Sequence, residues 1–287
     1  MSAPNLREPS KHKAVRYAWS AVGVGFTLLC IILAAGALLA ILGYVAAQGI
    51  SSVNWAFVTE LPRPVGITGG GVANGIVGSL IIVGIATLIA IPIGVLTGVY
   101  LALFGRGIFA ETLRLLSDVL AGLPSIAIGL FAYTLFVAPF KQFSAFSASI
   151  AFAIIMLPLI IRTSEEAIRS VPRTVREAGF ALGLSRYATT MKIVVPAARG
   201  AILTAILLGI ARVTGETAPL LFTAFGSQFW ELNPLHPMAE LSLQVFTYAI
   251  SPYDDWHRQA WAGALLLTVA VFIINLMARF ALSLGKR

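Results

Sequence analysis

Long apolar stretches alternate with short polar ones along the whole chain. Crossing roughly 30 Å of hydrocarbon at about 1.5 Å per residue takes about 20 apolar residues in a helix. Six stretches have this character, the fourth being short: residues 19–47, 74–103, 119–138, 147–161, 197–225 and 261–284. The pattern predicts an all-α polytopic membrane protein with six transmembrane helices.

The composition supports this prediction. Of the 287 residues, 58% are hydrophobic and only 11% are charged, and the mean hydropathy is +0.90. A soluble domain has about a quarter of its residues charged. The single cysteine, Cys30, excludes an internal disulfide and a tetrathiolate metal site. The first apolar run is too long for a signal-peptide core. We expect residues 1–17 to form a disordered cytoplasmic tail and residues 18–287 one transmembrane domain.

The distribution of Lys and Arg predicts the orientation of the chain in the membrane. Sixteen of the 20 lie in the N-terminal tail, after the second run, between the fourth and fifth runs, or near the C-terminus. Only Arg63, Lys141 and Arg258 lie in the alternate loops. Because basic loops stay in the cytoplasm, both termini are expected there. Topology therefore explains the net charge of +8 without a nucleic-acid partner, and residues 226–260 become the longest external loop.

Residues 162–196 form a long basic segment on the predicted cytoplasmic side. Pro172 cannot lie inside a continuous helix, so a short amphipathic helix can begin after it, at Arg173. Gly183 suits the left-handed position that ends this helix, and Ser185 can cap a second one. The pattern predicts helix, turn and helix. A segment of this kind also suits an interfacial loop that binds anionic lipid headgroups.

The same segment carries a recognisable spacing. Glu177-Ala178-Gly179 is followed after three residues by Gly183, and after nine more by Ile-Val-Val-Pro. This resembles the EAA loop of ABC importer permeases, with Gly179 in place of the second alanine and Val195 in place of leucine. In that family the short helix docks on a cytoplasmic ATPase. The resemblance implies that the coupling residues are Arg173, Glu177, Ala178, Gly179 and Gly183.

The chain contains no Gly-x-x-x-x-Gly-Lys-Ser/Thr phosphate loop. We therefore expect no cofactor in this chain, and ATP and Mg²⁺ to be bound by a partner ATPase. The chain is expected to be a transport subunit and not an enzyme, because no convergent His, Ser and acidic residues lie at one depth in the spans. No metal site is expected either, since Asp254, Asp255 and His257 suit a solvated loop end better.

Two charged residues interrupt the fifth apolar run. If one helix covers residues 198–223, Arg212 lies near the bilayer midplane and Glu216 lies one turn later on the same face. An arginine at that depth should face protein or water and have a partner. It suits an anionic substrate, and a carboxylate beside it suits phosphate, which keeps P–OH donors at neutral pH while sulfate has none. The alternative is a structural ion pair that holds helices together.

Further strings, at residues 70–79, 121–126 and 211–223, resemble the permeases of the phosphate-specific ABC importer. With the EAA-like loop, the resemblance covers residues 65–285 and is greater to the PstA-type permease than to its PstC-type partner. It implies the type I ABC importer permease fold and one half of a pathway for inorganic phosphate in a bacterial or archaeal plasma (inner) membrane. The implied pathway residues are Arg212, Glu216, Asn74 and Thr217.

The resemblance also implies partners. These are a second homologous permease of PstC type, a cytoplasmic ATPase dimer of PstB type and an external phosphate-binding protein of PstS type, with the lipid bilayer around the spans. The EAA-like loop does not define the substrate, so another oxyanion or solute stays open, as does a channel or passive scaffold. Asn74 and the glycines at 69–71 could bind an anion through backbone N–H groups or simply form an entry turn.

Overall fold

The structure is a computed structural model that describes residues 11–67 and 69–284, and most of these residues are helical. They divide into two compact units that adjoin at Gln48 and Gly49. The first unit is essentially α1 (Lys11–Gly49), whose most apolar stretch buries no residue. The helix begins inside the tail predicted over residues 1–17, and residues 1–10 of that tail lie outside the described residues.

Four described helices are long and apolar enough to cross a membrane: α1, α3 (Ala73–Leu103), α6 (Ala145–Arg169) and α13 (Asp254–Leu284). Two bent pairs raise the number to six if each pair is one span. In the first pair, α4 (Gly107–Gly122) meets α5 (Ser125–Ala132) and the π-helical turn Tyr133–Val137 at 105°. In the second, residues 186–197 meet α10 (Arg199–Thr214) at 68°. The predicted number of spans is compatible with this arrangement.

Small residues bring α3 and α6 together in the most extensive helix contact of the described residues. The buried face of α3 repeats every fourth position: Ile82, Ala86, Ala90, Gly94 and Gly98. A Cβ added at Gly98 would lie 2.7 Å from the Cβ of Ser164 and 2.9 Å from the carbonyl oxygen of Ile161. Close backbone approach through small residues is the usual way in which membrane helices associate.

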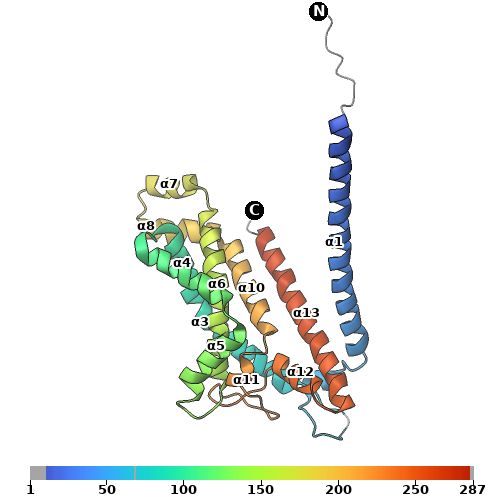
Figure 1. Cartoon of the computed structure of the whole chain (residues 1–287). Coiled ribbons are helices and arrows are strands. Elements are labelled where there is room, and N and C mark those ends of the chain that lie inside the picture. The colour runs from blue at the N-terminus through green and yellow to red at the C-terminus, as the bar shows by residue number, and fades with distance from the viewer. Residues whose placement is uncertain (1–10, 68, 285–287) are drawn as a thin grey trace, which may run out of the picture. The chain divides into compact units, whose positions relative to one another are not determined.

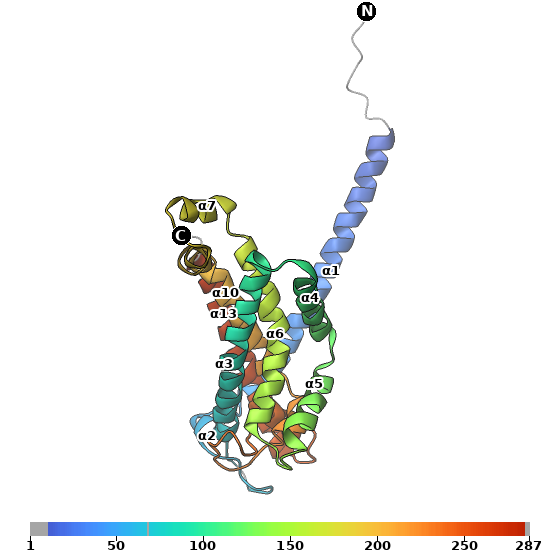
Figure 2. The same ribbon diagram turned by 90° about the vertical axis from the view of Figure 1, so that its left-hand side faces the viewer.

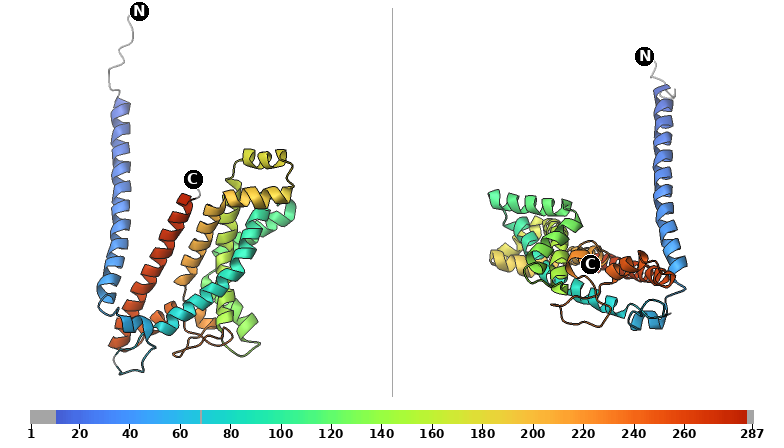
Figure 3. Two further views of the ribbon diagram at one scale, coloured as in Figure 1. Left: turned by 180° about the vertical axis from the view of Figure 1, so that it is seen from behind. Right: turned by 60° about the horizontal axis from the view of Figure 1, so that its bottom comes forward.

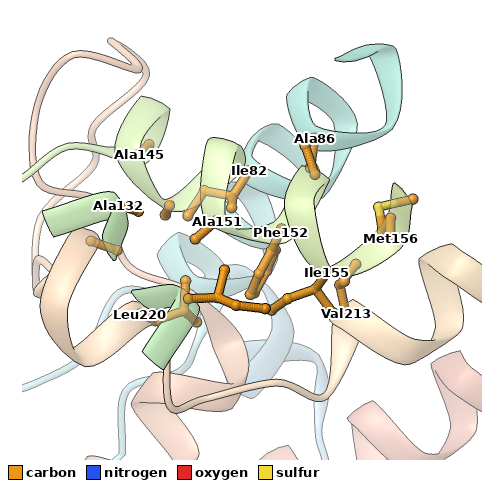
Figure 4. Packing of buried hydrophobic residues seen from close by; sticks show 14 of the residues in the cluster. Ile82, Ala86, Ala132, Ala145, Ala151, Phe152, Ile155, Met156, Val213 and Leu220 are labelled. Atoms are coloured by element: carbon orange, nitrogen blue, oxygen red, sulfur yellow. The ribbon is translucent and has the colours of Figure 1, made fainter. Parts of the chain in front are cut away.

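The core of the second unit surrounds the middle of α6 (Figure 4). Phe152 and Met156 of α6 pack there with Ile82 of α3, and with Val213 and Leu220 from the fifth apolar run. The fourth run, which is short in the sequence, is therefore the central helix. It also continues to Arg169, so the first eight residues of the predicted cytoplasmic loop are helical.

The elements of the second unit divide between its two ends. One end carries α7 (Arg173–Ala181) and α8 (Arg186–Thr189), and α13 also finishes there (Figures 1 and 2). The opposite end carries α2 (Trp55–Thr59), α11 (Leu220–Thr223) and α12 (Leu241–Ala249). Between the ends, α10 and α13 lie side by side (Figure 3, orange and red). The basic segment and the last helix thus share one end, as the predicted topology requires.

Two predicted spans are not continuous helices, and a proline lies near each break. The run 119–138 was expected as one helix, but α4 ends at Gly122 and Pro124 begins α5 in a new direction. The run 197–225 was also expected as one helix, but α10 ends at Thr214. In a continuous helix, the ring of Pro219 would collide with the carbonyl group of Gly215, four residues earlier.

The predicted external loop over residues 226–260 contains regular structure. α12 occupies residues 241–249 and buries Leu241, Leu243 and Tyr248 against its neighbours. The last residues of the predicted loop are the first turns of α13, which starts at Asp254. The longest predicted loop is therefore partly helical.

Candidate functional site

Arg212 lies in the last turn of α10, and its side chain is exposed. The next residue, Val213, is fully buried and packs in the core (Figure 4). The C-terminal end of a helix carries partial negative charge, which favours an arginine there. The guanidinium group makes no ion pair or hydrogen bond with any residue described in the structure. Its charge is therefore available to an anion or to another chain.

Glu216 does not pair with Arg212, contrary to the predicted spacing of one turn. It follows Gly215, the C-cap of α10, and its backbone N–H donates to the carbonyl oxygen of Val213 at 3.1 Å. The helix over residues 198–223 that the prediction required ends at Thr214 instead. No ion pair joins the two residues in the described part of the chain.

The turn between α10 and α11 presents Glu216 and Thr217, both half-buried. Neighbours hold the turn from two sides. A Cβ added at Gly129 of α5 would lie only 2.6 Å from the Cα of Pro219. From the other side, the hydroxyl of Ser242 on α12 donates to the carbonyl oxygen of Glu216 at 2.9 Å. The turn therefore has a defined position between α5 and α12.

Asn74 lies at the start of α3 and is only 4% exposed. Its Nδ2 donates to the carbonyl oxygen of Ser227 at 2.6 Å, while its Oδ1 has no hydrogen-bond partner among the described residues. Asn74 thus attaches α3 to the loop over residues 226–240, and no hydrogen bond within the described part joins it to Arg212 or Glu216. Gly69 and Gly70 have φ of +92° and +83°, so an entry turn accounts for these glycines.

The segment resembling the EAA loop forms the predicted helix, turn and helix. α7 begins directly after Pro172, and Gly183 takes a left-handed conformation with φ of +78°. The Oγ of Ser185 accepts a hydrogen bond from the backbone N–H of Ala188 at 3.2 Å, which caps α8. The second helix then continues as a π-helical turn, Thr190–Val194, and a short turn to Ala197, one residue beyond Pro196.

The five predicted coupling residues do not share one face. Arg173, Glu177, Ala178 and Gly183 are exposed. Gly179 is buried, and a Cβ there would lie 2.7 Å from Cγ2 of Thr189. Gly179 therefore allows α7 to pack on the following helix and does not face a partner.

Two exposed apolar side chains beside this turn were not predicted from the sequence. Leu182 is 80% exposed and Tyr187 is 71% exposed. No local pattern indicates them, because exposure depends on how the two short helices pack. Both side chains leave apolar surface uncovered at this end of the unit.

A second missed feature is a charge network at the same end of the unit. Glu165 on α6 is buried, and its Oε1 accepts from Nε of Arg114 at 2.9 Å and lies 2.7 Å from Nη2 of Arg169. Nη2 of Arg114 also donates to the carbonyl oxygen of Leu101 on α3 at 2.9 Å. The network joins α3, α4 and α6 just before the chain enters α7. Its sequence signal was Arg169, four residues after Glu165.

The outer end contains a buried carboxylate, Glu240, with no exposed surface. It is the N-cap of α12, and its Oε2 accepts from the backbone N–H groups of Ser242 at 2.7 Å and Leu243 at 3.0 Å. Its Oε1 accepts from the hydroxyl of Ser79 on α3 at 2.9 Å. Burial raises the pKa of Glu240, while these hydrogen bonds act in the opposite direction.

No group of three or more His, Cys, Asp or Glu residues in the described part of the chain could hold a metal ion. Asp255 pairs instead with Arg258, and His257 Nε2 lies 2.6 Å from the carbonyl oxygen of Ser251.

Comparison with known proteins shows the family of this chain. Residues 90–284 match the family described as binding-protein-dependent transport system inner membrane component. The chain is 43% identical to the phosphate transport system permease protein PstA of Yersinia pestis over 233 residues, which cover 81% of this chain and 79% of that protein. The PstA of Haemophilus influenzae is 46% identical over 211 residues, covering 73% and 75%.

A probable PstA of the archaeon Methanocaldococcus jannaschii is 32% identical over 275 residues, which cover 96% of this chain and 97% of that protein. Among solved structures, a chain of the inward-facing MetNI methionine ABC transporter superposes with a TM-score of 0.61. That likeness covers 75% of this chain and 96% of the other at 17% identity, so it concerns the fold alone. The fold is that of the type I ABC importer permeases.

Proposed function

Because this chain belongs to the family of binding-protein-dependent transport system inner membrane components, we propose that it is a permease subunit of an ATP-driven importer of inorganic phosphate. The observation that carries this proposal is its identity of 43% and 46% with two phosphate permeases, over 81% and 73% of its length. The chain is a multi-pass protein of the plasma membrane, in keeping with its family and its apolar helices.

In this function, Arg212 compensates the charge of phosphate in the translocation pathway. The support is its exposed, unpaired guanidinium at the end of α10, beside a turn that two other helices hold in place. An unpaired arginine is costly in lipid, so a surface that leaves it exposed in one subunit suits contact with a second permease and a substrate path between the two. This chain then forms half of the pathway, and Thr217 adds a hydroxyl next to Glu216.

Glu216 gives this pathway a means of selecting among oxyanions. An ionised carboxylate can only accept hydrogen bonds, and phosphate at neutral pH still offers P–OH donors. Sulfate at the same pH offers none and would meet only charge repulsion from Glu216. The two residues therefore act on the same substrate. Arg212 attracts the anion by charge, and Glu216 accepts a hydrogen bond from a P–OH group of phosphate.

The other end of the unit couples transport to ATP hydrolysis in a partner. α7 and its turn project from α6 as a short helix between Pro172 and the left-handed Gly183. Leu182 and Tyr187 add exposed apolar surface beside Glu177 and Ala178. A cytoplasmic ATPase that binds this tip would move it as a rigid body, and α6 would carry that movement into the core. ATP and Mg²⁺ belong to that ATPase.

The complete importer would contain a second homologous permease, an ATPase dimer and an external phosphate-binding protein. The end that carries α2, α11 and α12 would receive phosphate from the binding protein. The opposite end, with α7, would meet the ATPase. Both surfaces follow from the positions of the coupling segment and the outer loop at opposite ends of one unit (Figure 1).

The experiment that tests this function is uptake of radiolabelled phosphate and sulfate into proteoliposomes that contain the reconstituted importer. Wild type should take up phosphate in an ATP-dependent manner and exclude sulfate. Arg212→Gln should assemble and lose phosphate uptake. The matched control is Arg106→Gln, which removes an exposed arginine at the N-cap of α4. Sulfate uptake by wild type would overturn the substrate, and normal uptake by Arg212→Gln would overturn the role of Arg212.

A further inference from the structure

Glu240 lies at the centre of a series of hydrogen bonds that reaches the proposed pathway. The series begins at Ser79 in the first third of α3, passes through the carboxylate of Glu240 and continues to Ser242 on α12. It ends at the carbonyl oxygen of Glu216, to which the hydroxyl of Ser242 donates at 2.9 Å. Ser79 and Glu216 belong to other elements than Glu240 and Ser242, and both are distant from them in sequence.

The hydroxyl of Ser242 lies near two acceptors but carries only one proton. It is 2.6 Å from Oε2 of Glu240 and 2.9 Å from the carbonyl oxygen of Glu216. The backbone N–H groups of Ser242 and Leu243 already donate to Oε2 of Glu240. The cap is therefore held by the backbone as well, and the Ser242 hydroxyl bridges Glu240 and Glu216 with one proton shared between the two acceptors.

The segment that carries Glu240 packs tightly on α3. The carbonyl oxygen of Ala239 lies so close to Gly78 that no side chain would fit there. The hydroxyl of Ser79 donates to Glu240 and accepts from the backbone N–H of Leu241 at 2.9 Å. The N-terminus of α12 therefore cannot shift along α3 without breaking several contacts at once.

The geometry points to Glu240 as a positioning residue for the pathway: through Ser242 it holds the backbone of Glu216, and with it the Glu216 carboxylate, at a set distance from α3. This inference rests on the proposed function, because it assigns Glu240 a role in the passage of phosphate. Glu240 itself has no exposed surface, so its role is to position other groups. Without the bond from Ser242, the turn at Gly215 would lose its hydrogen bond to α12 and keep the contact of Pro219 with α5.

The test is the initial rate of radiolabelled phosphate uptake by the reconstituted importer, at varied concentrations of phosphate-loaded binding protein. Ser242→Ala should lower kcat by about three- to tenfold, the range that one hydrogen bond supports, and leave KM unchanged. Glu240→Gln should act in the same direction. The matched control is Ser251→Ala, because the hydroxyl of Ser251 donates only to the carbonyl oxygen of Tyr248, at the other end of α12.

A double-mutant cycle separates positioning from general loss of structure. In a Glu216→Gln background, Ser242→Ala should have little further effect, since the carboxylate that it positions is already gone. A variant that only weakens the fold would lower the rate by the same factor in both backgrounds, and that result would overturn the inference. Faster hydrogen exchange at the amides of residues 215–220 in Ser242→Ala is expected as well, and unchanged exchange would count against the inference.

The variants distinguish the pathway role of Arg212 and Glu216 from the positioning role of Glu240. If Glu216→Gln and Arg212→Gln both transport phosphate normally, the pathway itself is assigned wrongly. If Glu216→Gln is slow but Ser242→Ala and Glu240→Gln are normal, the pathway stands and only the positioning role is lost.

Discussion

Nε of Arg114 on α4 donates to the buried Oε1 of Glu165 on α6 at 2.9 Å, across 51 residues of sequence. The same arginine reaches the end of α3 through the carbonyl oxygen of Leu101. Glu165 also faces Arg169, in the last turn before the chain leaves α6 for α7. This single carboxylate therefore fixes three helices at the place where movement of the coupling segment would enter the membrane domain.

Replacing Glu165 should destabilise the subunit. Glu165→Gln leaves Arg114 and Arg169 without their carboxylate, and we expect a loss of about 2 kcal/mol, as for a hydrogen bond to a charged group. The measurement is the thermal unfolding midpoint of the purified complex. Asp255→Asn serves as the control, since it breaks only an exposed ion pair with Arg258 and should cost less than about 1 kcal/mol. Equal shifts in the two variants would contradict the central role of Glu165.

The contact between α3 and α6 leaves no room for an added methyl group, so such a substitution should lower the stability of the subunit. In Gly98→Ala the new Cβ would meet the backbone of α6, with the carbonyl oxygen of Ile161 at 2.9 Å, so we expect a loss of about 1–3 kcal/mol. Gly84→Ala is the same substitution on the same helix, but it faces open space and should be neutral or stabilising by up to about 1 kcal/mol. Unfolding midpoints of both variants, measured side by side, check this. If Gly98→Ala were as stable as Gly84→Ala, the packing would be looser than described.

The exposed leucine at the tip of the coupling segment should contribute to binding of the ATPase. Leu182→Glu replaces an apolar contact by a charge, and burial of one leucine is worth about 1.5–3 kcal/mol, so binding should weaken by about tenfold or more. Titration of the ATPase subunit onto the permease in nanodiscs measures this. Leu232→Glu makes the same substitution at an exposed leucine at the opposite end, and this variant should bind the ATPase normally. Normal binding by Leu182→Glu would remove this residue from the interface.

The buried Glu240 should produce a characteristic dependence of stability on pH. Burial raises its pKa in the folded protein above the ordinary value of 4.5. Above pH 4.5 the unfolded chain loses this proton while the folded chain keeps it, so the contribution of Glu240 to stability falls as the pH rises, by up to about 1.4 kcal/mol per unit. It is fully present below pH 4.5 and is lost as the pH passes the raised pKa of the folded state.

Glu240→Gln cannot titrate, so the comparison isolates this group. The unfolding midpoint of wild type relative to Glu240→Gln should be highest below pH 4.5 and should decline above it. A difference that stays constant or grows with rising pH would show that the hydrogen bonds from Ser79, Ser242 and Leu243 outweigh burial.

The sequence by itself determined the class of the protein and the form of its coupling segment. Apolar runs long enough to span a membrane follow from composition alone, and the resemblance to importer permeases was visible in short strings. Pro172, Gly183 and Ser185 specified a helix, a left-handed turn and a capped second helix, because each acts on the backbone within a few residues of itself. The structure confirms these local predictions.

Only the tertiary structure decided which apolar runs are continuous and which charged groups meet. Hydropathy does not distinguish a helix from a helix and a turn of equal apolarity, so the end of α10 at Thr214 and the separation of Glu216 from Arg212 were not predictable from it. Burial of Glu165 and Glu240 depends on donors 51 and 161 residues away, Arg114 and Ser79. A carboxylate is stable in a core only when such donors reach it, and that requires the folded chain to bring them together.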